Sequence, residues 1–302
     1  MIQYRRVYLE EFALFFKNKF PDMQTESPFE AAKGCTVGCG GRYSVAVFPR
    51  SFTELIEVVD FCIAEGKRYF VLGNGSNVLP SDGENEAVLI FTKKLVGGSF
   101  GQNPLVYAGV QISTFLNDCE KHGKSGAEFL AGIPSTVGGA AFMNAGAHGK
   151  RFDEIVKNVI VYKDGELHSY PKEECGYSYK HSRFMDEGGV IFAVIFNLEE
   201  TDSATVRRRR KDHIEARAWL PKGKSMGCVF KNPDGVSAGQ LIEGAGLKGL
   251  RIGGAVVSDV HANFILNDGG ATSKDIKTLI GIIKNSVYAQ YKIRLEEEIR
   301  YL

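Results

Sequence analysis

The sequence lacks the features that mark several large classes of protein. Its 302 residues carry 37 Lys and Arg against 36 Asp and Glu, so a net charge of +1 offers little to neutralise nucleic-acid phosphates. The one basic run, residues 207–211, is followed by acidic residues and is expected to be a solvated helix face. No apolar run approaches the roughly 18–20 residues that span a bilayer, and the N-terminus has no signal-peptide core. We therefore expect a cytoplasmic protein that binds neither nucleic acid nor membrane.

The six cysteines are too scattered to form a metal or disulfide framework. Only Cys35 and Cys39 lie close together, and no second pair of Cys or His near them completes a zinc site, so we expect no metal. A disulfide scaffold is not expected in a chain of this length, which suits a reducing compartment. Cys228 follows a glycine in a predicted turn, where a packing role and a chemical role both remain open.

From about residue 35 the chain alternates between strand and helix patterns. Strands are predicted near 43–48, 68–72, 86–91, 105–110, 155–163 and 190–198, and helices near 51–65 and 113–122. A polar stretch near 200–205 predicts a boundary between an N-terminal domain, 1–202, that opens with an amphipathic helix, and a C-terminal domain, 203–302. The second domain is expected to close with a helix capped by Thr272 and Asp275 and a strand from Ile293 to Tyr301.

Two glycine-rich segments favour a binding loop. The first, residues 73–77, follows a buried strand. It lacks the third glycine and the acidic residue of a Rossmann fingerprint, so alone it fits a plain turn equally well. The second, residues 130–149, is too rich in glycine for an ordinary helix and too long for a simple connector. Together they could clasp a dinucleotide through backbone N–H groups, although close backbone packing would also explain the glycines. The candidate cofactor-binding residues are Gly73, Asn74, Gly75, Ser76, Asn77, Gly132, Ile133, Pro134, Ser135, Gly138, Gly139, Ala140, Asn144 and Gly146.

Seven motifs in a fixed order carry a resemblance that none of them carries alone. They are "VLGNGSNVLPSD" (71–82), "AGIPSTVGGAAFMNAGAHG" (131–149), "YKHSRF" (179–184), "GCVFKNP" (227–233), "AGQLIEGAGLKG" (238–249), "VSDVHANFILN" (257–267) and "LEEEIR" (295–300). From about residue 30 to its end, the chain resembles the UDP-N-acetylenolpyruvoylglucosamine reductase family of flavoproteins. The short connection between the third and fourth motifs resembles the shorter class of that family, which lacks an extra substrate-capping loop.

The resemblance implies a fold and a reaction. The expected fold is α+β, with a two-lobed FAD-binding domain of the vanillyl-alcohol-oxidase-like (PCMH) type and a C-terminal α/β substrate domain. NADPH would reduce FAD, and the flavin N5 would deliver hydride to UDP-N-acetylglucosamine enolpyruvate, giving UDP-N-acetylmuramate for peptidoglycan synthesis.

The resemblance also implies roles for individual residues. Cys228 stands where the family usually has a proton-donating serine, and a thiol with a reference pKa of about 8.5 can also donate. Glu298 matches the family's glutamate, and Lys180 replaces its arginine, keeping the charge but losing the bidentate fork. Further substrate contacts are expected at Tyr179, Ser182, Arg183, Lys231, Asn232, Gln240, His261 and Asn263.

Two other functions fit parts of the sequence. Another FAD oxidoreductase of the same fold would share the glycine loops, but such enzymes generally lack the "GCVFKNP" and "LEEEIR" segments. A degenerate homologue that only binds a UDP-sugar would explain Cys228 and Lys180 as remnants of a lost site. Oxygen consumption without a UDP-sugar would indicate the first, and bound FAD without NADPH turnover would indicate the second.

Overall fold

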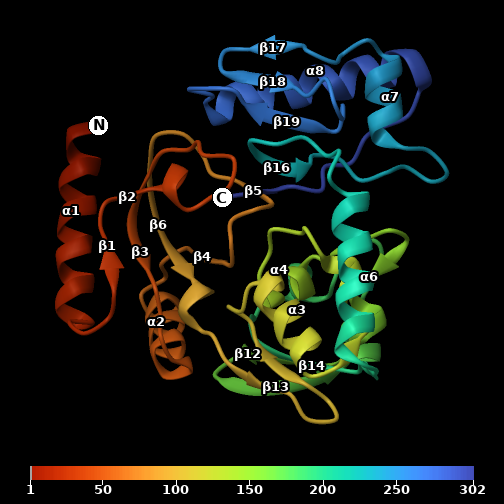
Figure 1. Cartoon of the computed structure of the whole chain (residues 1–302). Helices are drawn as coiled ribbons and strands as arrows, with labels where there is room; N and C mark the ends of the chain where they lie inside the picture. Colours follow the sequence, from red (N-terminus) through yellow and green to blue (C-terminus); the bar gives the residue numbers. More distant parts are fainter. Residues whose placement is uncertain (1) are drawn as a thin grey trace.

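The computed structural model describes residues 2–302, with side chains from Glu10 onwards. Figure 1 shows three parts: a first lobe around β3 and β6, a second around β12 and β14, and a C-terminal sheet with α7 and α8 that lies above both. The mixed α+β architecture and the two-lobed N-terminal half match the expectation. The domain boundary after residue 202 remains a prediction.

The first lobe is a small sheet covered by helices. Its strand order is β1-β3-β6-β4, with β2 also on β3, and β3, β6 and β4 run parallel. The helix predicted near 51–65 buries an apolar stripe that ends at Cys62, so Cys62 is a core thiol. The bounds are α1 Ile2–Lys19, β1 Thr25–Glu26, β2 Phe29–Glu30, β3 Arg42–Val47, α2 Phe52–Ala64, β4 Tyr69–Leu72 and β6 Glu84–Phe91.

The second lobe is an antiparallel sheet in the order β13-β12-β14-β8-β7. One apolar cluster fills it, and the glycine-rich second segment holds only one short helix, α4, as its composition predicts. The main bounds are β7 Gly98–Ser99, β8 Leu105–Tyr107, α3 Ile112–Lys121, α4 Val137–Phe142, β12 Val156–Lys163, β13 Glu166–Pro171, α5 Phe184–Glu187, β14 Val190–Phe196 and α6 Ser203–Ala216. Short pairs join β9 Lys124–Ser125 to β15 Glu199–Glu200, and β10 Gly146–Ala147 to β11 Lys150–Arg151.

The C-terminal part is an antiparallel sheet, β16-β19-β18-β17, packed against α8. The predicted capping box is present: Thr272 Oγ1 accepts from the Asp275 N–H at 3.1 Å, and the Asp275 carboxylate accepts from the Thr272 N–H at 2.9 Å. The bounds are β16 Lys224–Cys228, α7 Ala238–Gly244, β17 Arg251–Ile252, β18 Ala255–Val257, β19 Phe264–Asn267 and α8 Ser273–Tyr291.

The predicted strand at the end of the chain is wrong over most of its length. Only β20, Arg300–Tyr301, is a regular strand, and it pairs in parallel with β5, Val78–Leu79, in the first lobe. Leu295 and Ile299 are buried as the alternation predicts, but Tyr301 is 41% exposed. The segment 293–299 has no continuous partner strand because its backbone bonds are divided between the C-terminal sheet and the first lobe.

The basic run on α6 is largely exposed, as expected, and it also contacts the second lobe. Arg207 donates to Glu120 at 2.6 Å and Arg210 to Asn117 at 2.5 Å, both on α3, while Arg209 donates to Ser125 at 2.6 Å. These bonds hold α6 against the second lobe, and the helix points its C-terminal end toward β16 (Figure 1).

Candidate active site

A groove between the lobes collects much of the predicted cofactor site. Its cavity of about 410 Å³ is lined by the whole first glycine segment, Gly73–Asn77, and by Ser135, Gly138 and Gly139 of the second. The Asn74 side chain donates to the Pro134 carbonyl at 3.1 Å, so the two segments are joined directly.

The glycines of this groove are required by close backbone approach. Gly75 has φ +61°, and a Cβ there would lie 2.2 Å from the Gly34 carbonyl oxygen. A Cβ on Gly138 would lie 2.7 Å from the Ala108 Cβ. Backbone packing and an open groove therefore coexist, and Ser76 and Ser135 line the groove beside these glycines.

The remaining predicted cofactor residues lie outside the lining of that groove: Gly132, Ile133, Pro134, Ala140, Asn144 and Gly146. Asn144 is buried, and its amide donates to the Ser178 carbonyl at 2.9 Å and accepts from the Asp153 N–H at 2.9 Å. It therefore anchors the turn that carries Lys180. A direct cofactor contact from this group remains a prediction.

Lys180 occupies the tip of a tight turn. Ser178 and His181 are bridged across it, and Lys180 itself has φ +56°, a conformation that side-chain-bearing residues rarely adopt. Buried Ser182 donates to the Phe142 carbonyl at 2.6 Å and so ties the turn to α4. The strained backbone is held by these bonds, which aim the ammonium group into the site.

Cys228 lies at the end of β16, at an irregular register opposite Phe264. Gly227 before it has φ +75°, which turns the strand. Beyond it, the buried Asn263 amide accepts from the Phe230 N–H at 2.9 Å and donates to the Phe230 carbonyl at 2.8 Å. Asn263 thus holds the turn after Cys228, and because its amide is buried and bonded to Phe230, the predicted contact between its side chain and substrate has little room.

The end of the chain brings Glu298 to this turn. The Glu298 N–H donates to the Val229 carbonyl at 2.8 Å, while the Asn77 side chain donates to the Glu298 carbonyl at 3.0 Å. One residue is therefore bonded both to the catalytic turn and to the first glycine segment. This explains why the segment 293–299 does not belong to a single sheet.

The three predicted catalytic side chains meet beside the groove. Lys180 Nζ donates to Glu298 Oε1 at 2.8 Å, and their side chains are only 18% and 13% exposed. Burial, with a further contribution from Glu298, raises the pKa of the Cys228 thiol to about 11, although Lys180 and Arg217 oppose the shift. The thiol is therefore protonated at neutral pH, and a cation, a carboxylate and an acid lie together.

Some of the residues predicted to bind substrate are exposed, and others are bonded to neighbouring side chains. Tyr179 and Gln240 are exposed, and Tyr179 accepts from the Asn232 N–H at 3.3 Å. Lys231 pairs with exposed Glu296 at 2.5 Å. Arg183 is engaged, because it pairs with Glu187 at 2.8 Å and lies over the Tyr170 ring. It cannot replace the guanidinium missing at Lys180 without breaking those contacts.

Two residues near the site were not predicted. Arg217 ends α6 and acts electrostatically on Cys228. Trp219, the one tryptophan, is 58% exposed and stacks on His261 with ring centroids 5.5 Å apart. Both lie just before the "GCVFKNP" segment, outside every motif, so only their proximity in sequence to Cys228 could have suggested them.

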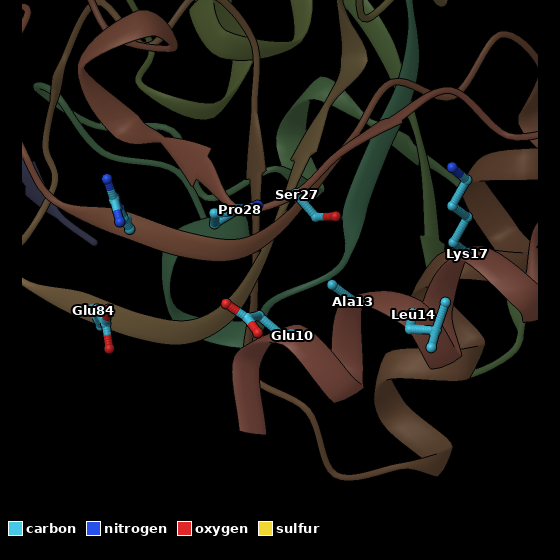
Figure 2. Close-up of a pocket in the computed structure, with 8 residues that line it drawn as sticks. Glu10, Ala13, Leu14, Lys17, Ser27, Pro28 and Glu84 are labelled. Carbon is cyan, nitrogen blue, oxygen red and sulfur yellow. The ribbon is translucent and has the colours of Figure 1, made fainter. Parts of the chain in front are cut away.

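The described residues also line a cavity that contains none of the predicted site residues. A second cavity, of about 360 Å³, lies between α1 and the strands of the first lobe (Figure 2), lined by Glu10, Ala13, Leu14, Lys17, Ser27, Pro28, Arg42 and Glu84. Over the described chain, no group of His, Cys, Asp and Glu could hold a metal ion. No helix within those residues has the length and apolar character needed to cross a membrane.

Comparisons with known proteins agree with this geometry. Residues 43–170 match the FAD binding domain family, and residues 220–302 match the C-terminal domain of UDP-N-acetylenolpyruvoylglucosamine reductase. Reductases of that name from Carboxydothermus hydrogenoformans and Protochlamydia amoebophila are each 38% identical, over 90% and 88% of this chain and 91% and 90% of their own. The crystal structure of the Thermus caldophilus enzyme is 36% identical, with a TM-score of 0.79 over 92% of this chain and 99% of its own.

The two-lobed fold, the glycine-lined groove and the acid beside it define an FAD-dependent oxidoreductase. More narrowly, the chain belongs to the UDP-N-acetylenolpyruvoylglucosamine reductase family. It is thus a flavin-dependent reductase of peptidoglycan precursor synthesis that uses NADPH.

Proposed function

We propose that the chain reduces UDP-N-acetylglucosamine enolpyruvate with Cys228 as the proton donor and with Lys180 and Glu298 holding the reacting group. The observation that carries this proposal is the 2.8 Å Lys180–Glu298 pair beside a protonated thiol at the edge of the groove. Reduction of an enolpyruvyl ether adds a hydride to its methylene carbon and a proton to the neighbouring carbon. Negative charge develops at that second carbon and its carboxylate before the proton arrives.

FAD, when bound, supplies the hydride after taking it from NADPH. The residues that would hold it are those of the groove, with Gly73–Asn77 against the diphosphate and Gly138 and Gly139 allowing close approach from the other side. Asn77 contributes to both sites, because its side chain donates to the Glu298 backbone.

Cys228 would deliver the proton. Because burial and Glu298 raise the pKa of the thiol to about 11, Cys228 holds its proton at neutral pH yet remains a stronger acid than the serine it replaces. Its position at the end of β16, fixed by the Asn263 clamp on Phe230, keeps the sulfur in place during transfer.

Lys180 and Glu298 would act as a pair on the enolpyruvyl group. The ammonium group stabilises negative charge on the carboxylate, although without the two-point geometry of a guanidinium. Glu298 fixes the direction of the ammonium group and would orient the enol form of the intermediate. Neither charge is left alone in this half-buried site, which would be costly.

The UDP part of the substrate would lie across the mouth of the site. The residues that would contact it are Tyr179, Lys231, Asn232, Gln240 and His261. Tyr179 lies in the turn around Lys180, Lys231 and Asn232 in the Lys-Asn-Pro segment, Gln240 on α7, and His261 between β18 and β19. Lys231 would exchange its exposed partner, Glu296, for a diphosphate oxygen.

Stopped-flow measurement of the two half-reactions tests the proposal. Cys228→Ala should leave reduction of the flavin by NADPH intact and slow its reoxidation by substrate by about 100- to 10,000-fold, the usual worth of a general acid. Cys228→Ser should retain substantial activity, and Cys175→Ser, at a buried thiol of the second lobe, should behave as the parent does. Equal loss in both half-reactions of Cys228→Ala would remove the proton-donor role. A parent that binds FAD but oxidises no NADPH with the UDP-sugar present would instead indicate a non-catalytic homologue.

We also infer that the protein acts in the cytoplasm. All six of its cysteines are free thiols, including the neighbouring Cys35 and Cys39. Free thiols are maintained in reducing compartments, and the proposed catalytic thiol needs one.

A further inference from the structure

Trp219 presents an exposed aromatic ring close to the proposed active site. It is the one tryptophan of the chain, and it lies 58% exposed in the connection between α6 and β16. One face of its indole is covered by the His261 ring, with the two rings 14° from parallel and their centroids 5.5 Å apart. The rest of the indole is open to a ligand.

The His261 ring that supports the indole is itself held in place. The Asn263 N–H donates to His261 Nδ1 at 3.2 Å, and the Phe264 ring lies against the imidazole with centroids 5.2 Å apart. A Cβ at Gly239 would lie 2.9 Å from His261 Cε1, so the imidazole also packs directly on α7. Burial lowers the pKa of His261, so its ring is neutral at neutral pH. The indole therefore rests on a fixed, uncharged support.

This stack of rings connects Trp219 to the proposed proton donor. Phe264, at its inner end, is the register partner of Cys228 across β16 and β19. Two ring contacts, from Phe264 to His261 and from His261 to Trp219, lead from there to the exposed indole. Trp219 therefore lies at the periphery of the proposed active site, at a distance from Cys228 that the two rings set.

That position suits the base of a UDP-sugar. A hexose, a diphosphate and a ribose separate the enolpyruvyl group from the uracil ring, so the base must lie well away from the acid that protonates the enolpyruvyl carbon. Nucleotide bases stack on exposed aromatic side chains, and tryptophan offers the largest such surface. The nicotinamide ring of NADPH must instead reach the flavin, which places it at the reacting centre rather than at the outer end of the stack.

We propose that Trp219 is the stacking platform for the uracil ring of the UDP-sugar, with His261 as its support. The inference rests on the proposed function, and it adds a binding residue that lies outside every sequence motif. The uracil ring takes no part in the chemistry, so stacking holds it equally in the ground state and in the transition state. Trp219 thus determines which nucleotide is bound and is not a catalytic residue.

Calorimetric titration of the FAD-bound enzyme with three probes tests the platform. UDP carries the base and the diphosphate, inorganic pyrophosphate resembles the diphosphate alone, and NADP+ carries the aromatic rings of the other nucleotide. The variants are Trp219→Ala and Trp219→Phe. Leu167→Ala is the matched control, because Leu167 is also 58% exposed but lies on β13 of the second lobe.

Trp219→Ala should weaken UDP binding by about 5- to 100-fold, the typical effect of losing one stacked base, and should leave pyrophosphate binding unchanged. Trp219→Phe should lose less, because a smaller ring remains, and Leu167→Ala should match the parent. In turnover, Trp219→Ala should raise KM for the UDP-sugar with little change in kcat, as expected for a contact made equally in both states.

The single tryptophan gives a second readout that needs no substitution. The fluorescence of the parent reports on Trp219 alone, and saturating UDP should change it while pyrophosphate should not. Parental UDP binding by Trp219→Ala overturns the proposal, and a loss confined to NADP+ would assign the ring to the other nucleotide. Equal weakening of UDP and pyrophosphate overturns it as well, because the base would then have no part in the effect.

If Trp219→Ala does not fold, unchanged fluorescence of the parent at saturating UDP overturns the proposal equally. Failure of the proposed function is distinguishable, because the parent would then bind UDP at Trp219 without oxidising NADPH in the presence of the UDP-sugar.

Discussion

The groove lined by the glycine segments differs in construction from the corner formed by Lys180, Cys228 and Glu298. The groove is made mainly of backbone from two continuous segments, and its shape depends on glycines such as Gly75, whose missing side chain lets the chain pass within van der Waals contact of Gly34. The corner is made of side chains: Lys180 and Glu298 are 118 residues apart in sequence, and Cys228 comes from a third segment. A substitution should therefore disrupt the groove through steric conflict, whereas in the corner it should leave a charge unpaired.

The substitution expected to disrupt the groove most is Gly75→Ala. The new Cβ would meet the Gly34 carbonyl at 2.2 Å in a left-handed conformation, so we expect complete loss of FAD and a colourless protein. Gly66→Ala is the matched control, because Gly66 has φ +59° with open space around it and should lose only about 1–2 kcal/mol of stability. Visible absorption and thermal unfolding measure both, and a Gly75→Ala protein with stoichiometric FAD would contradict the steric account.

Substitutions in the corner should slow the reaction with substrate without loss of FAD. Lys180→Ala leaves Glu298 unpaired and removes the cation, so reoxidation of the flavin by substrate should slow by about 10- to 100-fold. Lys180→Arg should be close to the parent rate or above it, because the charge stays and the fork is gained. Lys163→Ala breaks the Lys163–Glu187 pair in the second lobe and serves as the control. An alanine variant at Lys180 with parental half-reactions would place the carboxylate-binding charge elsewhere.

The smallest expected effect is a pH dependence confined to the corner. The pKa of the Cys228 thiol is raised above its ordinary value to about 11, so the proton is present below that value and is lost as the pH rises through it. The substrate half-reaction should therefore show no fall through mildly alkaline pH and should decline only near pH 11. Cys228→Ser should lack this decline, since a serine hydroxyl does not ionise there. A parent rate that falls near the reference thiol pKa of about 8.5 would contradict the buried-acid description.

Local sequence pattern was sufficient for most of the fold. The stripe on α2, the capping box of α8 and the strands β4 and β6 follow from residue order alone, because helix and strand periodicities are local properties. The ordered motifs also predicted Cys228, Lys180 and Glu298 together, and the structure brings these three side chains into one place.

Long-range contacts decided what local pattern could not. The segment 293–299 alternates like a strand, yet its backbone bonds are divided between Val229 and Asn77, so it joins no single sheet. Residues 207–209 are exposed, as their composition predicts, but their bonds to Glu120 and Ser125 of the second lobe could not be read from that composition. In both cases the partner lies far away in the chain, where periodicity carries no information.

The sequence by itself determined the family and the glycine segments, and it predicted Cys228 as the acid, because these depend on which residues follow one another. Only the tertiary structure decided the electrostatics of the corner. It pairs Lys180 with Glu298, engages Arg183 elsewhere and leaves the buried Nε of Arg217 without a partner among the described residues. Charges interact through space, and the balance of a site is fixed only when distant segments are brought together.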